Sequence, residues 1–240
     1  MRLQKRIDGY LNTLTPTPWP SKCIAISDVH ASDGSEHDVL VASNSEKVLL
    51  AKLDTYLSKG YALLKGGDWW DVWRGATVGN IQNAHPELTY LVEAFRKADL
   101  LYEILGNHER PDFAFPEAYV FNGFDKTLFF DHGFFEDFPN DHCWWIGRGV
   151  ITIENWLHKD PQDAPLTSPR PENAFRHDLV VRLRQEVADA NPNIDFLWGH
   201  THYFYNIKNN HNSGSPTNGV QSNGSIEGFL IEEGVFTPLP

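Results

Sequence analysis

The chain has 240 residues, a length that suits one compact domain and is too short for two large ones. It carries 20 Lys and Arg against 32 Asp and Glu, a formal net charge of −12, so we do not expect a nucleic-acid binder, because this surface repels phosphate backbones. Hydrophobic residues make up 41% of the chain, which excludes wholesale disorder. The 11 histidines are many for a chain with so few basic residues.

Two cysteines, Cys23 and Cys143, are too few for a disulfide framework or a Cys-rich zinc site and indicate a reducing compartment. The first twenty residues contain no apolar run of signal-peptide length, and no stretch reaches the roughly 18 apolar residues of a membrane span. We therefore expect a cytoplasmic protein. Residues 1–20 are expected to form a lead-in whose Thr/Pro stretch, residues 15–20, is extended and outside the core, and residues 21–240 a single domain.

The first half of the chain alternates short apolar runs with helical patterns. Strands are expected at Lys22–Ser27, Tyr61–Leu64 and Leu100–Leu105, each followed by polar residues. Helices are expected between them, one after the capping-box sequence Ser43–Glu46 and one beginning at Pro86. This order of strands and helices predicts an α/β fold with functional residues at the strand exits.

The second half is richer in strands. Asn122-Gly123 predicts a hairpin turn between strands at 118–121 and 127–131. A helix is expected at Asn173–Ala190, followed by strands at 194–198, 203–208, 228–232 and 235–237. Residues 206–218 are polar and contain Gly and Ser, so we expect them to form a mobile loop.

Polar side chains follow five of the expected strands. They are Asp28 and His30, Asp68 and Asp71, Asn107, His108 and Glu109, His132, and His200 and His202. Taken singly, each cluster also fits turn chemistry, a helix cap or a surface histidine. Together they are better explained as a site, because the exits of parallel strands meet at one rim of a sheet.

The donors at this rim are carboxylates, imidazoles and an amide, without a thiolate. This set indicates Mn²⁺, Fe or Zn²⁺ in a hydrolytic site rather than structural zinc. Seven donors are too many for one ion: Asp28, His30, Asp68, Asn107, His132, His200 and His202. The sequence therefore predicts two metal ions that share a carboxylate.

The strand-exit residues form an ordered series: Asp28-x-His30, Gly67-Asp68-x-x-Asp71, Gly106-Asn107-His108-Glu109, His132-Gly133 and Gly199-His200-x-His202. The series resembles the signature of calcineurin-like metallophosphoesterases. The resemblance implies a four-layer α/β/β/α sandwich, in which two mixed β-sheets pack face to face with helices outside. It also implies the ligands: Asp28, His30 and His202 for one ion, Asn107, His132 and His200 for the other, and Asp68 as the bridge between them.

Mn²⁺ is the expected metal, with Fe or Zn²⁺ as alternatives. Two such ions would acidify a bridging water to hydroxide, which attacks phosphorus in line. By resemblance, His108 is the general acid and Asp71 the carboxylate that orients it, although Asp71 also fits an N-cap or a surface charge. Arg74, Arg110 and Arg148 are candidate phosphate-binding residues, with a solvated surface role as the alternative.

The expected reaction is hydrolysis of a small phosphodiester or pyrophosphate. Residues 67–73 (GDWWDVW), with Asn223-Gly224-Ser225, are similar to the subgroup containing bacterial UDP-diacylglucosamine pyrophosphatases, which usually carries Arg where this chain has His108. A phosphomonoesterase, a nuclease of the same superfamily and a non-catalytic scaffold are the alternatives. Residues 134–176 are a candidate cap insertion, whose tryptophans would line the site or pack the insertion onto the domain. Nothing in the sequence indicates an oligomeric state.

Overall fold

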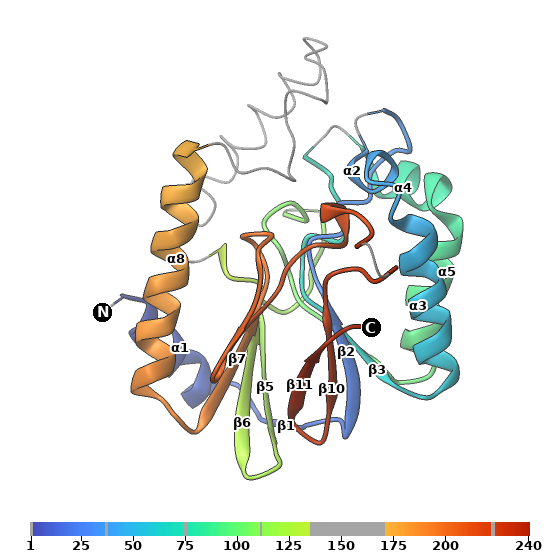
Figure 1. Ribbon diagram of the computed structural model, residues 1–240. Helices are drawn as coiled ribbons and strands as arrows, with labels where there is room; N and C mark the ends of the chain where they lie inside the picture. Colours follow the sequence, from blue (N-terminus) through green and yellow to red (C-terminus); the bar gives the residue numbers. More distant parts are fainter. Residues whose placement is uncertain (1, 37, 74–75, 111, 135–170, 222–223) are drawn as a thin grey trace.

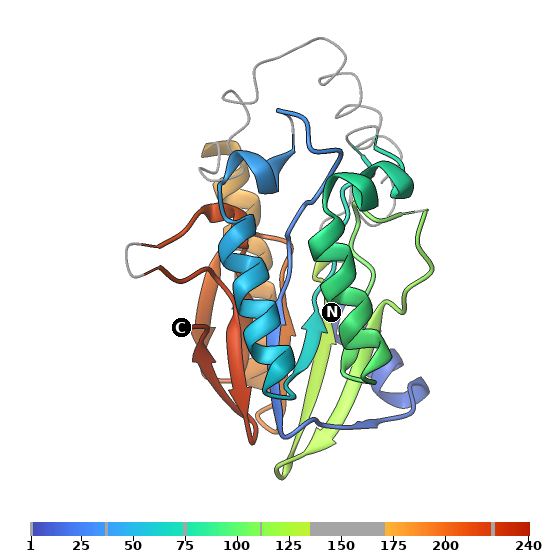
Figure 2. The same cartoon turned by 90° about the vertical axis from the view of Figure 1, so that its right-hand side faces the viewer.

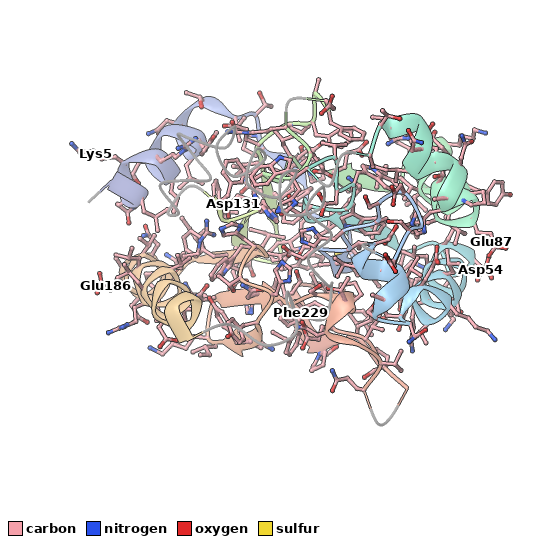
Figure 3. The ribbon with its side chains drawn as sticks, turned by 90° about the horizontal axis from the view of Figure 1, so that it is seen from above. Lys5, Asp54, Glu87, Asp131, Glu186 and Phe229 are labelled. Atoms are coloured by element: carbon pink, nitrogen blue, oxygen red, sulfur yellow. The ribbon has the colours of Figure 1, made fainter. Side chains whose placement is uncertain are left out.

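The computed structural model describes residues 2–36, 38–73, 76–110, 112–134, 171–221 and 224–240. This part of the chain forms four layers, with two β-sheets face to face and helices outside each sheet (Figures 1 and 2). Seen from above, Lys5 and Glu186 mark the helices on one side, Asp54 and Glu87 those on the other (Figure 3). The predicted α/β/β/α sandwich of two mixed sheets is confirmed.

The first sheet, sheet A, has six strands in the order β1-β5-β6-β7-β9-β8. Their bounds are β1 Thr17–Pro18, β5 Ala118–Gly123, β6 Lys126–Asp131, β7 Ile194–Trp198, β9 Asn210–Ser213 and β8 Phe204–Ile207. The second, sheet B, has the order β11-β10-β2-β3-β4. Its strands are β11 Val235–Pro238, β10 Phe229–Glu232, β2 Lys22–Ile26, β3 Ala62–Lys65 and β4 Leu101–Glu103. The pairs β2/β3, β3/β4, β6/β7 and β7/β9 are parallel.

Helices cover the outer faces of both sheets. The described helices are α1 Arg2–Thr13, α2 Val39–Ala42, α3 Glu46–Ser58, α4 Val78–Ala84, α5 Pro86–Lys97, α8 Pro171–Ala190 and the 3₁₀ helix η3 Pro216–Asn218. Helices α1 and α8 lie outside sheet A, and α3 and α5 lie outside sheet B (Figure 1). None of these helices is long and apolar enough to cross a membrane.

Three apolar layers hold the sandwich together, because side chains along a strand alternate between its two faces. In β2, Cys23 and Ala25 pack in the layer between the sheets, whereas Ile24 and Ile26 pack toward α3 and α5. On the other side, Phe129 of β6 joins the layer that sheet A shares with α1 and α8. Burial of these three layers is the main force that fixes the strand ends relative to one another.

The N-terminal segment differs from the expectation. Residues 15–20 are extended, and Thr15, Pro16 and Pro18 are exposed, but the segment joins sheet A: β1 pairs in parallel with β5, and Trp19 is 5% exposed in the layer between the sheets. The helix α1, which the sequence did not predict, precedes them and buries Ile7 against sheet A. The division of the chain at residue 20 stays a prediction.

The predicted hairpin turn is displaced. Asn122 and Gly123 belong to β5, and the turn lies at Phe124 and Asp125, which have φ of 54° and 58°. The glycine serves packing instead, because a Cβ on Gly123 would lie 3.0 Å from Cβ of Trp19. The capping box is also wrong, since Ser45 is the N-cap of α3 and Glu46 contacts His85.

The predicted mobile loop at 206–218 is wrong. It contains η3 and the strand β9, all four of whose residues are buried although all are polar. The polar groups of β9 and of the preceding Asn209 are hydrogen-bonded within the fold. Trp198 Nε1 donates to Asn210 Oδ1, and Asn209 Nδ2 donates to the carbonyl oxygens of Ala188, Asn191 and Ile194. The polar composition of this segment therefore did not indicate exposure, because the asparagine side chains form hydrogen bonds within the fold in place of hydrogen bonds to water.

Candidate metal centre

The five strands with polar exits are β2, β3 and β4 of sheet B and β6 and β7 of sheet A. The strand exits were predicted to meet at one rim of a single sheet, but the structure brings them together at the same end of two packed sheets (Figure 1). The predicted side chains lie close enough to offer ligand atoms in groups. These are Asp28, His30 and His202, then Asp68, His132 and His200, and a third group of His30, Asp71 and His108.

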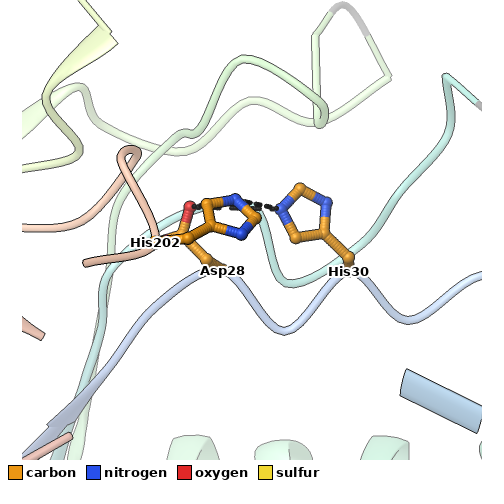
Figure 4. A group of neighbouring side chains, drawn as sticks. All are labelled: Asp28, His30 and His202. Carbon is orange, nitrogen blue, oxygen red and sulfur yellow. Dashed lines mark hydrogen bonds and ion pairs between the residues drawn. The ribbon is translucent and has the colours of Figure 1, made fainter. Parts of the chain in front are cut away.

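The first group has the spacing of ligands around one ion (Figure 4). Nε2 of His30 and Nε2 of His202 lie 3.1 Å apart, and Nε2 of His202 lies 3.4 Å from Oδ1 of Asp28. Ligand atoms about 2.1 Å from a metal, at angles of about 90° to 110°, are about 3.0 to 3.4 Å apart. The residues therefore fit a divalent metal ion.

The second group is oriented for the same task. Nδ1 of His132 lies 2.7 Å from the carbonyl oxygen of Gly66, which fixes the ring and turns Nε2 toward Oδ2 of Asp68 at 3.1 Å. Such a hydrogen bond to a backbone carbonyl is the usual support of a metal-binding histidine. Asn107 Oδ1 is buried and has no hydrogen-bond partner within the described part of the chain, so a ligand there would satisfy it.

Asp68 lies between the two groups. Its Oδ2 atom is 3.1 Å from Nε2 of His132 and 4.0 Å from Nε2 of His30. Asp28 is also close to both groups, because its Oδ1 lies 3.9 Å from Nε2 of His132. Asp68, which the resemblance implies as the bridge, and Asp28 each have a carboxylate oxygen within 4.0 Å of a histidine of the other group.

The backbone of the centre is unusual. Five of its residues have positive φ, which is uncommon outside glycine: Asp28 (56°), His30 (50°), Asp68 (51°), His200 (67°) and His202 (59°). Each such residue costs about 1 to 3 kcal/mol and clusters of them mark functional sites, where the surrounding structure imposes them. The strand exits are therefore bent so that consecutive polar side chains enter the same centre.

Glycine permits the close approach of these exits. A Cβ on Gly106 would overlap the Asp68 carboxylate, and a Cβ on Gly199 would overlap Asp28. The backbone amide of His200 donates to Oδ1 and Oδ2 of Asp28 at 3.1 and 3.0 Å, and that of His108 donates to Oδ1 of Asp68 at 2.8 Å. Each central carboxylate is thus fixed by the exit of another strand.

Buried carboxylates and imidazoles determine the electrostatics. Burial raises the pKa of Asp28. Burial acts in the same direction on Asp68, but attraction to neighbouring imidazoles, His132 first, outweighs it and holds the pKa of Asp68 well below its usual range. Burial lowers the pKa of His132, but the two carboxylates outweigh it and raise that pKa to about 10. Metal binding at His132 would therefore release a proton.

His202 behaves in the opposite way. Burial and the neighbouring His30 hold the pKa of His202 well below its usual value. A neutral imidazole keeps a lone pair for a cation, and the Asp28 carboxylate lies beside it. The first group is therefore prepared for a metal without prior loss of a proton from His202.

His108 and Asp71 form a pair at the edge of the centre. Nδ1 of His108 lies 3.0 Å from Oδ1 of Asp71, and Oδ2 of Asp71 lies 3.5 Å from Nδ1 of His30. Asp71 is fully buried, so the alternative of a surface charge is wrong. Its Oδ1 also accepts a hydrogen bond from the backbone amide of Trp73, so Asp71 stabilises the turn at residues 71–73 as well as contacting His108.

Of the three candidate phosphate-binding arginines, the structure describes Arg110. Its Nη2 donates to Oε1 of Glu117 at 2.6 Å, and its guanidinium lies over the ring of Phe134 at 4.4 Å. Arg110 is thus held in place beside the loop that carries His108. Arg74, Arg148 and residues 135–170 of the candidate cap lie outside the described residues.

Glu109, named in the sequence only as part of the strand-exit motif, supports the centre from outside the predicted ligand set. It is fully buried, and its carboxylate accepts hydrogen bonds from the backbone amides of Trp69 and Gly106 at 3.2 and 2.9 Å. It also pairs with the buried Lys65 at 3.1 Å, so it ties the β3 exit to the β4 exit. Its place beside His108 in the motif was an available sign of this role.

Two asparagines of the segment 206–218 also support the centre. Asn212 Nδ2 donates to the carbonyl oxygen of Gly199 and to Oγ1 of Thr201, both at 2.9 Å, and Asn218 Nδ2 donates to the carbonyl oxygen of His202 at 2.6 Å. They hold the loop that carries His200 and His202. No feature of the sequence pointed to them.

Two solved structures show a distant likeness to this chain. No family model matches the sequence, and no curated protein matches it. Among solved structures, a dimetal phosphatase from Danio rerio is 12% identical, with a TM-score of 0.48 over 89% of this chain and 93% of that one. A conserved protein from Streptococcus pneumoniae, described as a predicted phosphoesterase, is 14% identical, with a TM-score of 0.38 over 90% and 84%. At these values neither establishes a family, so the function rests on the site.

Proposed function

We propose that this protein is a phosphoester hydrolase that uses two divalent metal ions. The observation that carries the proposal is the position of Asp68 between two groups of donors, 3.1 Å from His132 and 4.0 Å from His30. Asp28, His30 and His202 would hold one ion, Asn107, His132 and His200 the other, and Asp68 both. When bound, two adjacent ions supply a hydroxide nucleophile at neutral pH and neutralise the charge of the phosphate oxygens.

The protein's own groups supply the remaining chemistry. His108 holds a proton at Nε2, on the opposite side of the ring from Asp71, and donates it to the leaving oxygen. Asp71 fixes the orientation of the ring through Nδ1. Arg110 lies two residues from His108 and is available to bind a phosphate oxygen while Glu117 keeps its guanidinium in place.

The proposed substrate is a small phosphodiester or pyrophosphate, and the proposed metal is Mn²⁺, with Fe or Zn²⁺ as alternatives. The net charge of −12 disfavours a nuclease. Similarity to UDP-diacylglucosamine pyrophosphatases rests on residues 67–73 and on Asn223-Gly224-Ser225. Within the first stretch, Trp69 donates to the carbonyl oxygen of Ile26 and Trp73 stacks on His108, so these two tryptophans support no particular substrate. We propose a cytoplasmic location because the two cysteines, Cys23 and Cys143, are too few for a disulfide framework.

Metal content and hydrolysis test the proposal together. The purified protein, stripped of metal and reloaded with Mn²⁺, should bind two ions per chain and hydrolyse aryl phosphodiesters. Asp68→Asn should lower kcat by roughly 10³-fold, because a shared ligand is lost. Asp189→Asn, on the exposed surface of α8, is the control and should leave kcat unchanged.

Two results would contradict the proposal. If the reloaded protein hydrolyses neither monoesters nor diesters although two ions bind, the chain is the non-catalytic scaffold. If it hydrolyses esters equally well without metal, the site works by another chemistry.

A further inference from the structure

The imidazole of His108 contacts two aromatic rings and one carboxylate. Trp73 stacks on one face, with ring centroids 4.3 Å apart and an interplanar angle of 19°. His30 meets the ring at 4.7 Å and 86°. Asp71 binds Nδ1 at 3.0 Å. Rotation of the ring about its side-chain torsions would break at least one of these contacts.

Asp71 also contacts the backbone of Trp73. One oxygen, Oδ1 of Asp71, accepts from the backbone amide of Trp73 and contacts Nδ1 of His108, both at 3.0 Å. Trp73 is 2% exposed and belongs to the core layer between sheet B and its helices, so its ring is a rigid wall. His108, with 14% of its side chain exposed, retains access to solvent.

We infer that Trp73 is a positioning residue that aims Nε2 of His108 at the leaving oxygen, and that the natural substrate is a phosphate ester of an aliphatic alcohol rather than a pyrophosphate. The inference rests on the proposed function and narrows its substrate class. A flat aromatic face at stacking distance restrains the imidazole without competing for its nitrogen atoms. Trp73, His30 and Asp71 thus together fix the orientation of one proton donor, His108.

The chemistry of the reaction explains why a well-oriented proton donor indicates an alkyl ester as substrate. The oxygen of a water molecule forms the new bond to phosphorus, and the bond from phosphorus to the ester oxygen breaks. The electron pair stays on the ester oxygen, which takes the proton from Nε2 of His108, and the proton lost by the water restores His108 through the solvent. An alkoxide is strongly basic and needs this proton, whereas a phosphate or 4-nitrophenolate leaves readily without it.

The test compares leaving groups in the Mn²⁺-loaded full chain. The substrates are a 4-nitrophenyl and an alkyl ester, each as monoester and diester, and a nucleotide-sugar pyrophosphate. The variants are Trp73→Leu, which removes the aromatic face, and Trp73→Phe, which retains one. Trp69→Leu is the matched control, because Trp69 is equally buried in the same loop and donates its indole N–H to the carbonyl oxygen of Ile26.

Trp73→Leu should lower kcat for the alkyl ester by about 10- to 100-fold, since a small misplacement of a catalytic group has effects of this size. Its kcat for the 4-nitrophenyl ester and its KM for both esters should change less than about threefold, because binding and nucleophile are untouched. Trp73→Phe should recover most of the loss. Trp69→Leu should affect both esters to the same extent.

Several outcomes would overturn the inference. Equal loss on both esters in Trp73→Leu assigns Trp73 to packing alone. A wild-type enzyme that cleaves the pyrophosphate faster than every alkyl ester excludes the substrate class. If Trp73→Leu does not fold, the dependence of wild-type kcat on leaving-group basicity decides: it should be nearly flat and should become steep in His108→Asn. A wild type inactive on all substrates contradicts the proposed function instead, so the two failures are distinguishable.

Discussion

The Nε2 atoms of His30 and His202 lie 3.1 Å apart, although 172 positions separate the two residues in the chain. One comes from the exit of β2 in sheet B and the other from the loop after β7 in sheet A. Two imidazole nitrogens at this distance face each other through a shared proton or a shared cation. Asp28, 3.4 Å from His202, makes the cation the better partner, because it adds a negative ligand.

Replacing His202 should remove one metal ion. His202→Ala takes one of three donors from the first group. Loss of an outer-shell partner lowers metal affinity by about 10- to 100-fold, and loss of a direct ligand should lower it further. The second group keeps its ligands. Mass spectrometry of the dialysed protein should show one ion per chain instead of two.

The control for this variant is another buried histidine. His211 is 3% exposed and stacks on Phe236, away from both donor groups. His211→Gln should retain two ions per chain. Two tightly bound ions in His202→Ala would show that the group of Asp28, His30 and His202 is not a metal site.

Asn212 should tune the metal affinity without binding metal. Asn212→Leu leaves the carbonyl oxygen of Gly199 without its side-chain donor and frees Thr201, which loosens the loop before His202. We expect roughly a tenfold loss of metal affinity, as for other outer-shell partners, measured by competition with a chelating dye. Asn206→Ala, exposed on β8, should have no effect, and unchanged affinity in Asn212→Leu would limit Asn212 to the fold.

The buried pair of Arg184 and Asp131 should stabilise the attachment of α8 to sheet A. Arg184 donates to the two Asp131 oxygens at 2.7 and 2.5 Å, and its guanidinium lies 4.5 Å from the ring of Trp198. Arg184→Met leaves a buried carboxylate without this partner, so the free energy of unfolding in urea should fall by about 3 to 5 kcal/mol.

The double variant Arg184→Met/Asp131→Leu should recover most of this loss, because no charge is then left buried. As a control, Lys208→Met removes the exposed pair with Asp189 and should change the free energy of unfolding by less than about 1 kcal/mol. If Arg184→Met resembles Lys208→Met, the pair contributes no more than a surface contact.

His85 should make the stability depend on pH. Its Nε2 lies 2.7 Å from Asp38 and its Nδ1 2.6 Å from Glu46. Burial lowers the pKa of His85, but the two carboxylates outweigh burial and raise it from 6.5 to about 9. The folded state therefore binds a proton that the unfolded state has lost, so this contribution, on the order of 3 kcal/mol, is complete below pH 6.5 and disappears as pH rises past about 9.

The effect is measured by urea unfolding at pH 6 and pH 9, after metal has been removed with a chelator. The free energy of unfolding of the wild type is compared with that of His85→Gln. The wild type should lose more stability over this range than the variant, in which the titrating group is absent. Equal losses in the two proteins would show that His85 contributes no pH-dependent stability.

Much of the site could be predicted because its signal is local. Apolar runs such as Lys22–Ile26 and Ile194–Trp198 have the composition of buried strands, and the polar residues that follow them stand out in the sequence. Parallel strands then bring their exits together, which is a property of the topology. Asp28 and Asp68 could be grouped on this basis before any distance was known, whereas His132 follows a strand of the other sheet and joins them only because the two sheets pack face to face.

The tertiary structure alone decided which residues support those ligands. Trp19 packs in the core, Asn212 donates a hydrogen bond to the carbonyl oxygen of Gly199, and Trp73 stacks on His108. Each of these contacts joins residues that are not neighbours in the sequence. Composition describes a side chain's own preference, whereas burial of a polar group depends on whether another residue satisfies it. The sequence therefore determined the chemistry of the centre, and the packing of the two sheets decided how each group is held and aimed.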